Sequence, residues 1–314
     1  MLKRALEEIG RIGRSGPERD TLTTDQAAKL SDLETNGYTI IDKFVGTERI
    51  ANLQEVYRNR LEQDMDIELP CLAQSRIDPD AHAELIQKNF LASRAQLDEM
   101  GIAFDRKDIQ SYEQVLTEFE PSTLTMTLPD MADFFDLWLD EDIVAISQAY
   151  MGFAPLLTEA YIRRNFPAKF KVMNHNWHRD RNHPRFLLKA FIFLSDCTLR
   201  TGPHHYISGS IQDRTLDGKP YFTDAEIEAA YPADTGRHIK SVVPAGTIVL
   251  EDTRGLHKAG VPEEGYRDLG FAVFTPPIAL RPPAVLYQIS EPVWSCLDSE
   301  QRKFIPKGNR RTDH

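Results

Sequence analysis

Apolar residues follow two different periods in the two halves of this chain. In the first half they recur every three or four positions, which is the spacing of amphipathic helices. This pattern predicts helices over residues 24–35, 47–65, 80–100, 111–119 and 131–151, and a strand over 38–45. Thr23 or Thr24 caps the first helix, and Gly37 separates it from the strand. The first half is therefore predicted to be mostly helical.

From about residue 158 the pattern changes to short runs typical of strands, separated by Gly, Pro and Asn. These runs cover residues 160–166, 186–194, 239–243, 247–250 and 269–275. A polar stretch, the 211–236 insertion, lies between two of them and contains a predicted short helix over 224–230, either as a lid or as a surface excursion. The predicted fold class is mainly β with helical additions, built as a sandwich or jelly roll.

Composition fits one globular protein of 314 residues, with 41% apolar and 27% charged side chains. We expect a flexible segment over 1–22, a single domain over 23–305 and a C-terminal tail over 306–314. A net charge of -11 argues against nucleic acid as a partner. Three well-separated cysteines and the lack of a long apolar run predict a soluble, cytoplasmic protein without membrane contact.

Candidate metal ligands occur in the sequence Asn-Trp-His-Arg-Asp at 176–180. His178 and Asp180 are two positions apart, so in an extended segment both side chains point to the same side. A third candidate, His257, follows the apolar run at 247–250. Two histidines and one carboxylate form the facial set that suits non-haem iron(II) and leaves coordination positions open. A lone His-x-Asp more often belongs to an ordinary hydrogen-bonded loop.

Arg267, ten residues after His257, strengthens the metal interpretation. A dicarboxylate that chelates a metal through its keto-acid end needs an anchor for its far carboxylate, and a planar guanidinium can hold that group with two hydrogen bonds. Alone, such an arginine is more often a surface residue or a salt-bridge partner. The combination of His178, Asp180, His257 and Arg267 in this order is what points to a site.

The chain resembles the phytanoyl-CoA dioxygenase family of iron(II)/2-oxoglutarate-dependent oxygenases. The resemblance covers about residues 158 to 276, with a weaker similarity near the start. It is carried by Trp-His-Arg-Asp at 177–180, the strand at 188–196, Thr-Gly-Pro-His-His-Tyr-Ile-Ser-Gly-Ser at 201–210, Ala-Gly-Thr-Ile-Val-Leu-Glu-Asp at 245–252, His257 and Arg267. The family fold is a double-stranded β-helix, a jelly roll with helices packed on one sheet.

The resemblance implies iron(II), Fe(2+), bound by His178, Asp180 and His257, with 2-oxoglutarate as co-substrate, anchored by Arg267, and O2 as oxidant. It makes Phe191 a candidate wall of the co-substrate pocket, with core packing as the simpler alternative, and Lys189 a second carboxylate partner. Relatives that transfer halide lack the carboxylate of the triad. Its presence here favours hydroxylation of an unactivated carbon, although desaturation or cyclisation would use the same ligands.

Two alternatives remain open at this point. A jelly-roll protein that binds a ligand without catalysis would not need Arg267, and a cupin-like enzyme with another metal would use His204 and His205. One departure from the family is Gly-Ser-Ile-Gln at 209–212, where a histidine usually follows Gly-Ser. His175 and His183 flank the His-x-Asp motif and are predicted not to bind the metal.

The substrate is predicted only as a small molecule, and the oligomeric state is not predicted. Residues 160–190 contain eight basic side chains and one acidic one, Asp180, within an acidic chain. Such a local excess focuses positive potential on the predicted mouth of the site and favours an anionic substrate. The alternative is that the charges merely protect solvated strand edges. The basic residues are Arg163, Arg164, Lys169, Lys171, Arg179, Arg181, Arg185 and Lys189.

Overall fold

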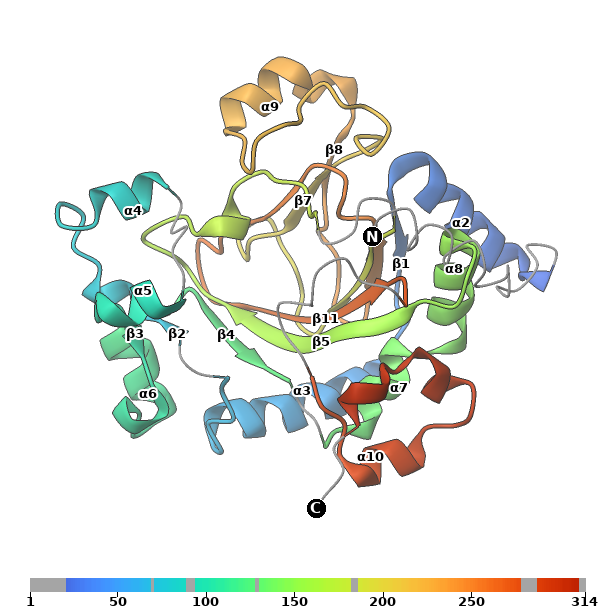
Figure 1. Cartoon of the computed structure of the whole chain (residues 1–314), viewed down its shortest axis with the longest axis horizontal. Helices are drawn as coiled ribbons and strands as arrows, with labels where there is room; N and C mark the ends of the chain where they lie inside the picture. The colour runs from blue at the N-terminus through green and yellow to red at the C-terminus, as the bar shows by residue number, and fades with distance from the viewer. Residues whose placement is uncertain are drawn as a thin grey trace.

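Two antiparallel sheets of unequal size face each other in the structure, a computed structural model (Figure 1). It describes residues 21–68, 71–88, 94–127, 130–181, 186–277 and 287–310. The larger sheet has six strands in the order β1-β9-β6-β11-β5-β4, and the smaller has three in the order β10-β7-β8. The strands of the larger sheet, in that order, are Tyr38–Ile41, Ile248–Glu251, Leu188–Phe193, Arg267–Thr275, Leu156–Asn165 and Thr123–Met126. Those of the smaller are His257–Ala259, His204–Ile207 and His238–Lys240.

Helices precede and follow the strands in the chain. In the N-terminal half these are α2 (Thr24–Asn36), α3 (Thr47–Glu62), α4 (Ala83–Gln87), α5 (Arg94–Glu99), α6 (Tyr112–Gln114), α7 (Ala132–Trp138) and α8 (Glu141–Met151). Later come α9 (Asp224–Ala230) and α10 (Glu291–Cys296). A small ribbon, β2 (Cys71–Leu72) with β3 (Ala103–Phe104), lies beside α4 to α6 (Figure 1). None of the helices in these described ranges is long and apolar enough to cross a membrane.

The local signals in the sequence account for the ends of several helices. The predicted first helix is confirmed as α2, with Thr23 forming a capping box and Gly37 ending the helix at a φ of 86°. The single helix predicted over 131–151 is wrong, because Asp140 interrupts it and caps α8 by accepting a hydrogen bond from the backbone N–H of Asp142. Within 80–100 the structure has two short helices, α4 and α5, instead of one.

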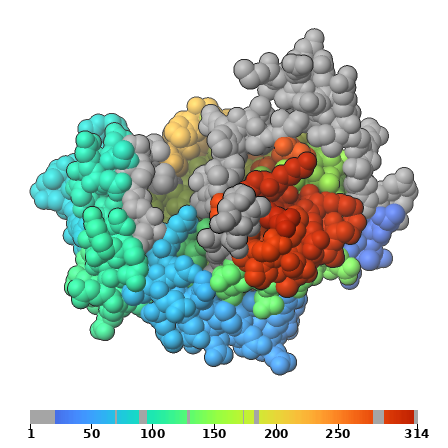
Figure 2. All heavy atoms as spheres, turned by 60° about the horizontal axis from the view of Figure 1, so that its bottom comes forward, coloured from blue at the N-terminus to red at the C-terminus, as the bar shows by residue number. Residues whose placement is uncertain are grey.

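Alternation along the strands of the larger sheet separates a helix-facing side from a site-facing side. The main apolar core lies on the helix-facing side, where α3 and α7 pack beneath the sheet (Figure 1). On the surface below it, α3 lies beside the C-terminal segment that contains α10 (Figure 2). Core side chains from the strands include Ala160, Ile162, Ala190, Ile192, Ile248, Leu250, Ala272 and Phe274.

The predicted jelly roll with helices on one sheet is confirmed by this arrangement. The predicted short helix at 224–230 is confirmed as α9, which lies between β7 and β8 in the chain. The strands β2, β3 and β4 of the N-terminal half were not predicted. Two further strands, β7 and β10, were not predicted either, because their three or four residues are mostly histidine, lysine and tyrosine. These two strands form the wall of the smaller sheet that faces the larger one.

Candidate metal centre

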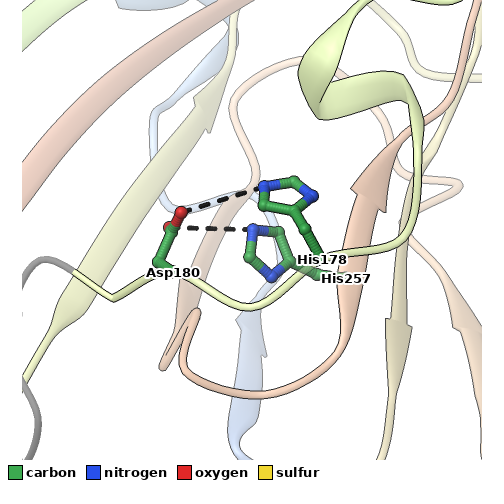
Figure 3. Close-up of side chains that lie close together, drawn as sticks. All are labelled: His178, Asp180 and His257. Carbon is green, nitrogen blue, oxygen red and sulfur yellow. Dashed lines mark ion pairs between the residues drawn. The ribbon is translucent and has the colours of Figure 1, made fainter. Parts of the chain in front are cut away.

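Backbone pairing brings the three predicted ligands together (Figure 3). The His178 N–H donates to the His257 carbonyl at 2.9 Å, and the His257 N–H donates back to the His178 carbonyl at 3.0 Å. The Asp180 N–H donates to the Thr253 carbonyl at 2.9 Å. One potential ligand atom from each of His178, Asp180 and His257 lies within 4.8 Å of the others. The segment from 177 to 180 therefore extends the smaller sheet beside β10.

Both histidines are oriented by the carbonyl two residues before them. Nδ1 of His178 lies 2.8 Å from the Asn176 carbonyl, and Nδ1 of His257 lies 3.0 Å from the Gly255 carbonyl. Nδ1 must carry the proton to donate to a carbonyl, so each Nε2 keeps a lone pair. These Nε2 atoms lie 3.8 Å and 3.7 Å from the oxygens of Asp180. The two nitrogens and the carboxylate converge on one point.

The electrostatic surroundings favour the protonation states that a metal ion requires. Burial and the nearby His178 lower the pKa of His257 well below its ordinary value, so its ring is neutral. Burial alone would raise the pKa of Asp180, but the charge of Lys189 holds it well below the usual range. A deprotonated carboxylate beside the neutral imidazole of His257 and the ring of His178 forms a donor set that suits a divalent ion of the iron–zinc type.

Lys189 points from β6 into the same space. Its Nζ lies 2.6 Å from Oδ2 of Asp180, and both side chains are 16% exposed. The contact is a close ion pair between a lysine and the carboxylate that is the predicted metal ligand. The structure thus brings Lys189 to the predicted metal ligand, while its role as a partner of the co-substrate carboxylate stays a prediction.

Arg267, the first residue of β11, is 1% exposed and lacks an acidic partner among the residues that the structure describes. Its Nε and Nη1 atoms are buried without a hydrogen bond. Burial lowers the pKa of its guanidinium. Because an unpaired buried cation is costly, these donors fit a ligand carboxylate better than a structural role.

The triad and Arg267 line one pocket of about 240 Å³ between the two sheets. Phe191 forms part of its wall and packs edge-on against Phe271, with ring centroids 5.1 Å apart. Phe191 also belongs to a buried apolar cluster. It therefore both lines the pocket and packs in the core, as the two alternative predictions for this residue describe. The other lining residues are Glu159, Tyr161, Arg163, Asn165, Asn174, Lys189, His204, Ala259, Leu269 and Phe271.

Four of these lining residues come from alternate positions of β5, namely Glu159, Tyr161, Arg163 and Asn165. Only Arg163 was singled out from the sequence. The signal that identifies the others is a polar or aromatic residue at every second position of an otherwise apolar strand. The predicted strand begins at residue 160, whereas β5 begins at Leu156, so Glu159 lies outside the predicted strand.

The basic excess predicted over 160–190 does not form a positive mouth, because most of it is neutralised by acids from distant parts of the chain. Arg164 points away from the pocket and donates to Asp268 at 2.8 Å and to Glu62 at 2.6 Å. Pairs of the same kind join Lys169 to Glu120, Lys171 to Asp224, Arg181 to Asp217 and Lys189 to Asp180. Of the eight, only Arg163 and Lys189 line the pocket among the described residues, and Arg185 lies outside them.

The histidines of β7 cannot share a metal ion, because consecutive strand residues face opposite sides. His204 lines the pocket and its Nε2 lies 2.9 Å from Oε1 of the buried Glu251. His205 faces the other side and packs edge-on against Trp177 at 5.9 Å. The cupin-like alternative based on this pair is therefore not supported. His175 is buried outside the triad, and His183 lies outside the described residues.

Comparison with known proteins agrees with the fold. No protein-family model matches the sequence, and no curated protein matches it. Among solved structures, the non-heme α-ketoglutarate-dependent carbocyclase SnoK from nogalamycin biosynthesis is 15% identical with a TM-score of 0.52, covering 86% of this chain and 90% of SnoK. The non-heme α-ketoglutarate-dependent epimerase SnoN from the same biosynthesis has 15% identity and a TM-score of 0.52, over 82% of this chain and 86% of SnoN.

A third similar structure is the apo form of EctD from S. alaskensis, at 16% identity and a TM-score of 0.51, covering 87% of this chain and 88% of EctD. At these identities the likeness concerns the fold alone. The chain thus has the jelly-roll fold of non-haem α-ketoglutarate-dependent enzymes, and a His-Asp-His cluster lies between its sheets.

Proposed function

We propose that this protein is an iron(II)- and 2-oxoglutarate-dependent oxygenase. The observation that carries the proposal is that one pocket contains both a convergent His-Asp-His cluster and a buried arginine, Arg267, with no acidic partner in the described part of the chain. SnoK and SnoN, which share the fold, are described as α-ketoglutarate-dependent, and one structure of SnoN contains Fe3+ and α-ketoglutarate. A ligand-binding protein without catalysis would need neither feature.

In this proposal His178, Asp180 and His257 hold the iron, and Arg267 holds the far carboxylate of 2-oxoglutarate. Together with O2, the bound iron and co-substrate supply an oxidant that attacks C–H bonds while 2-oxoglutarate is converted to succinate and carbon dioxide. Phe191 and Phe271 exclude water from the pocket wall. Lys189 keeps the Asp180 carboxylate deprotonated, because its Nζ lies 2.6 Å from Oδ2 of Asp180.

The proposed reaction is hydroxylation of an unactivated carbon in a small molecule, since Asp180 supplies the carboxylate that halide-transferring relatives lack. The spaced motifs support membership of the phytanoyl-CoA dioxygenase family. An anionic substrate group would bind at Arg163, whose guanidinium lies over the rings of Tyr161 and Phe271 at 4.6 Å and 5.4 Å. Nε of Arg163 is buried without a hydrogen bond.

The first experiment measures succinate released from 2-oxoglutarate with iron(II) under air while anionic metabolites are screened. The wild-type protein should form succinate, and His178→Ala should fall to the background rate because a metal ligand is lost. His82→Ala is the matched control, since His82 is half-buried just before α4, far from the triad in the sequence, and its ring lies against the backbone of Asp78. If the wild-type protein with iron(II) forms no succinate with any substrate in the screen, the oxygenase proposal is wrong and a ligand-binding protein is the better interpretation.

The substrate class is tested with Arg163→Gln once a substrate is found. Loss of one charge-assisted hydrogen bond costs about 1.5–3 kcal/mol, so the KM for an anionic substrate should rise roughly tenfold or more. Arg200→Gln is the control, because Arg200 is exposed and pairs with Glu264. An unchanged KM in Arg163→Gln would exclude the anionic assignment without affecting the oxygenase proposal.

A further inference from the structure

The residues that alternate with the metal ligands all contact the 211–236 insertion or the residues that adjoin it. His178 and Asp180 point into the pocket, so Trp177, Arg179 and Arg181 point to the other side. The backbone N–H of Phe222, in the insertion, donates to the Trp177 carbonyl at 2.8 Å. The ligand-bearing segment is therefore held between β10 on one edge and the insertion on the other.

Arg179 makes the most extensive of these contacts. Its guanidinium donates to the backbone carbonyls of Ser210 at 2.7 Å, Asp213 at 3.0 Å and Leu216 at 3.1 Å. A fourth bond, at 2.9 Å, reaches the carbonyl of Arg254, in the turn that leads to His257. Arg179 is 6% exposed and has no ion pair with a carboxylate in the described part of the chain. One planar side chain thus joins both ligand-bearing segments to the start of the insertion.

Asp224, the first residue of α9, makes a second connection. The Trp177 Nε1–H donates to its Oδ1 at 2.8 Å, and Lys258 Nζ forms an ion pair with the same oxygen. Trp177 precedes His178, and Lys258 follows His257, so one carboxylate holds the neighbours of both histidine ligands. A third contact comes from Tyr221, whose ring centroid lies 6.0 Å from that of His178.

We infer that the 211–236 insertion supports the metal centre from behind, and that Arg179 and Asp224 are positioning residues for the metal ligands. In Figure 1 α9 lies beyond β7 and β8, on the side of the smaller sheet that faces away from β5 and β11. This position differs from that of a lid over the pocket. The inference rests on the proposed metal site, because it concerns how firmly the ligands are held for the ion.

The test measures binding of Co(II), a spectroscopic probe for iron(II), to the full-length metal-free protein by titration and by its visible absorption spectrum. Substitutions of groups that orient metal ligands typically weaken metal binding about 10- to 100-fold. Arg179→Lys should lose affinity in that range, because an ammonium cannot bond four separated carbonyls. Asp224→Asn should weaken binding by a smaller factor, about threefold to tenfold, since Asp224 is largely exposed.

Glu228→Gln is the matched control, because it removes the same charge from an exposed position of α9 without a contact to Trp177 or Lys258. The melting temperature of each metal-free protein separates the two possible roles. A purely structural role lowers that temperature but leaves the Co(II) affinity and spectrum of the folded protein unchanged. If Asp224 positions the metal ligands, Asp224→Asn changes both the Co(II) affinity and the absorption spectrum, whereas Glu228→Gln changes neither.

Wild-type Co(II) affinity and spectrum in both Arg179→Lys and Asp224→Asn would overturn the inference while leaving the proposed function intact. If Arg179→Lys does not fold, Asp224→Asn decides alone, because its exposed side chain is replaced by a group of the same size. Failure of the wild-type protein to bind Co(II) would overturn the proposed metal centre and this inference together.

Discussion

Replacing Arg267 with methionine should stabilise the protein in the absence of 2-oxoglutarate and abolish tight binding of that molecule. Arg267 is 1% exposed, and two of its nitrogens have no hydrogen-bond partner among the residues within the described ranges. A buried cation without a counter-ion opposes folding, and replacing buried charges with apolar side chains of similar volume is often neutral or stabilising by about 1–4 kcal/mol. The expected stability change therefore has the opposite sign to that of most core substitutions.

The effect on co-substrate binding follows from the same two nitrogens. Each charge-assisted hydrogen bond to a carboxylate contributes about 1.5–3 kcal/mol, so losing two costs about 3–6 kcal/mol. That corresponds to a roughly 10²- to 10⁴-fold rise in the Kd of 2-oxoglutarate. Urea unfolding without ligand measures the first effect, and calorimetric titration of the Co(II)-loaded protein with 2-oxoglutarate measures the second.

Arg164→Met is the matched control, because Arg164 is 2% exposed but fully paired with Asp268 and Glu62 on the helix-facing side of β5. Removing one partner of a buried ion pair should destabilise the protein by about 3–5 kcal/mol. The Kd of 2-oxoglutarate should stay unchanged in this control. A destabilised Arg267→Met protein that still binds 2-oxoglutarate with wild-type affinity would show that Arg267 is structural, and would refute the reasoning.

Two further predictions concern the surroundings of the triad. Gly255→Ala places a Cβ 1.9 Å from the Tyr206 hydroxyl, and overpacking of this kind costs about 1–3 kcal/mol in urea unfolding. Adding Tyr206→Phe should recover part of that loss, and no recovery would contradict the steric explanation. Burial, with Arg267 and Lys171 nearby, lowers the pKa of His175 to about 4. His175 takes up a proton near pH 6.5 in the unfolded chain but only near pH 4 in the folded protein. The free energy of unfolding therefore falls by about 2 kcal/mol between pH 7 and pH 5. His175→Gln should reduce that pH dependence, and an unchanged slope would count against a neutral buried ring.

Local chemistry explains why much of the site was predictable from the sequence. His178 and Asp180 share a side because strand residues two apart always do, whatever the rest of the chain adopts. The strands that precede His257 and contain Arg267 are apolar enough to be recognised alone. The same applies to α2, whose capping residue and terminal glycine are adjacent in sequence to the helix that they delimit.

Short polar strands were not predictable in this way. β7 and β10 have three or four residues and owe their conformation to pairing with each other, with β8 and with the segment around His178. Their own side chains carry little strand preference. The bend at Asp140 was hidden for a related reason, since apolar spacing continues across it while the cap begins a new helix.

The sequence by itself determined the fold class, the order of the four candidate site residues and the sides of the strands on which they lie, because these depend on spacing along the chain. Only the tertiary structure decided which charges act in the site. Arg163 and Arg164 are neighbours, yet one lines the pocket and the other is neutralised by Asp268 and Glu62, far away in the sequence. That Arg267 has no acidic partner among the residues that the structure describes is likewise decided by the tertiary packing, since a partner could have come from a distant segment.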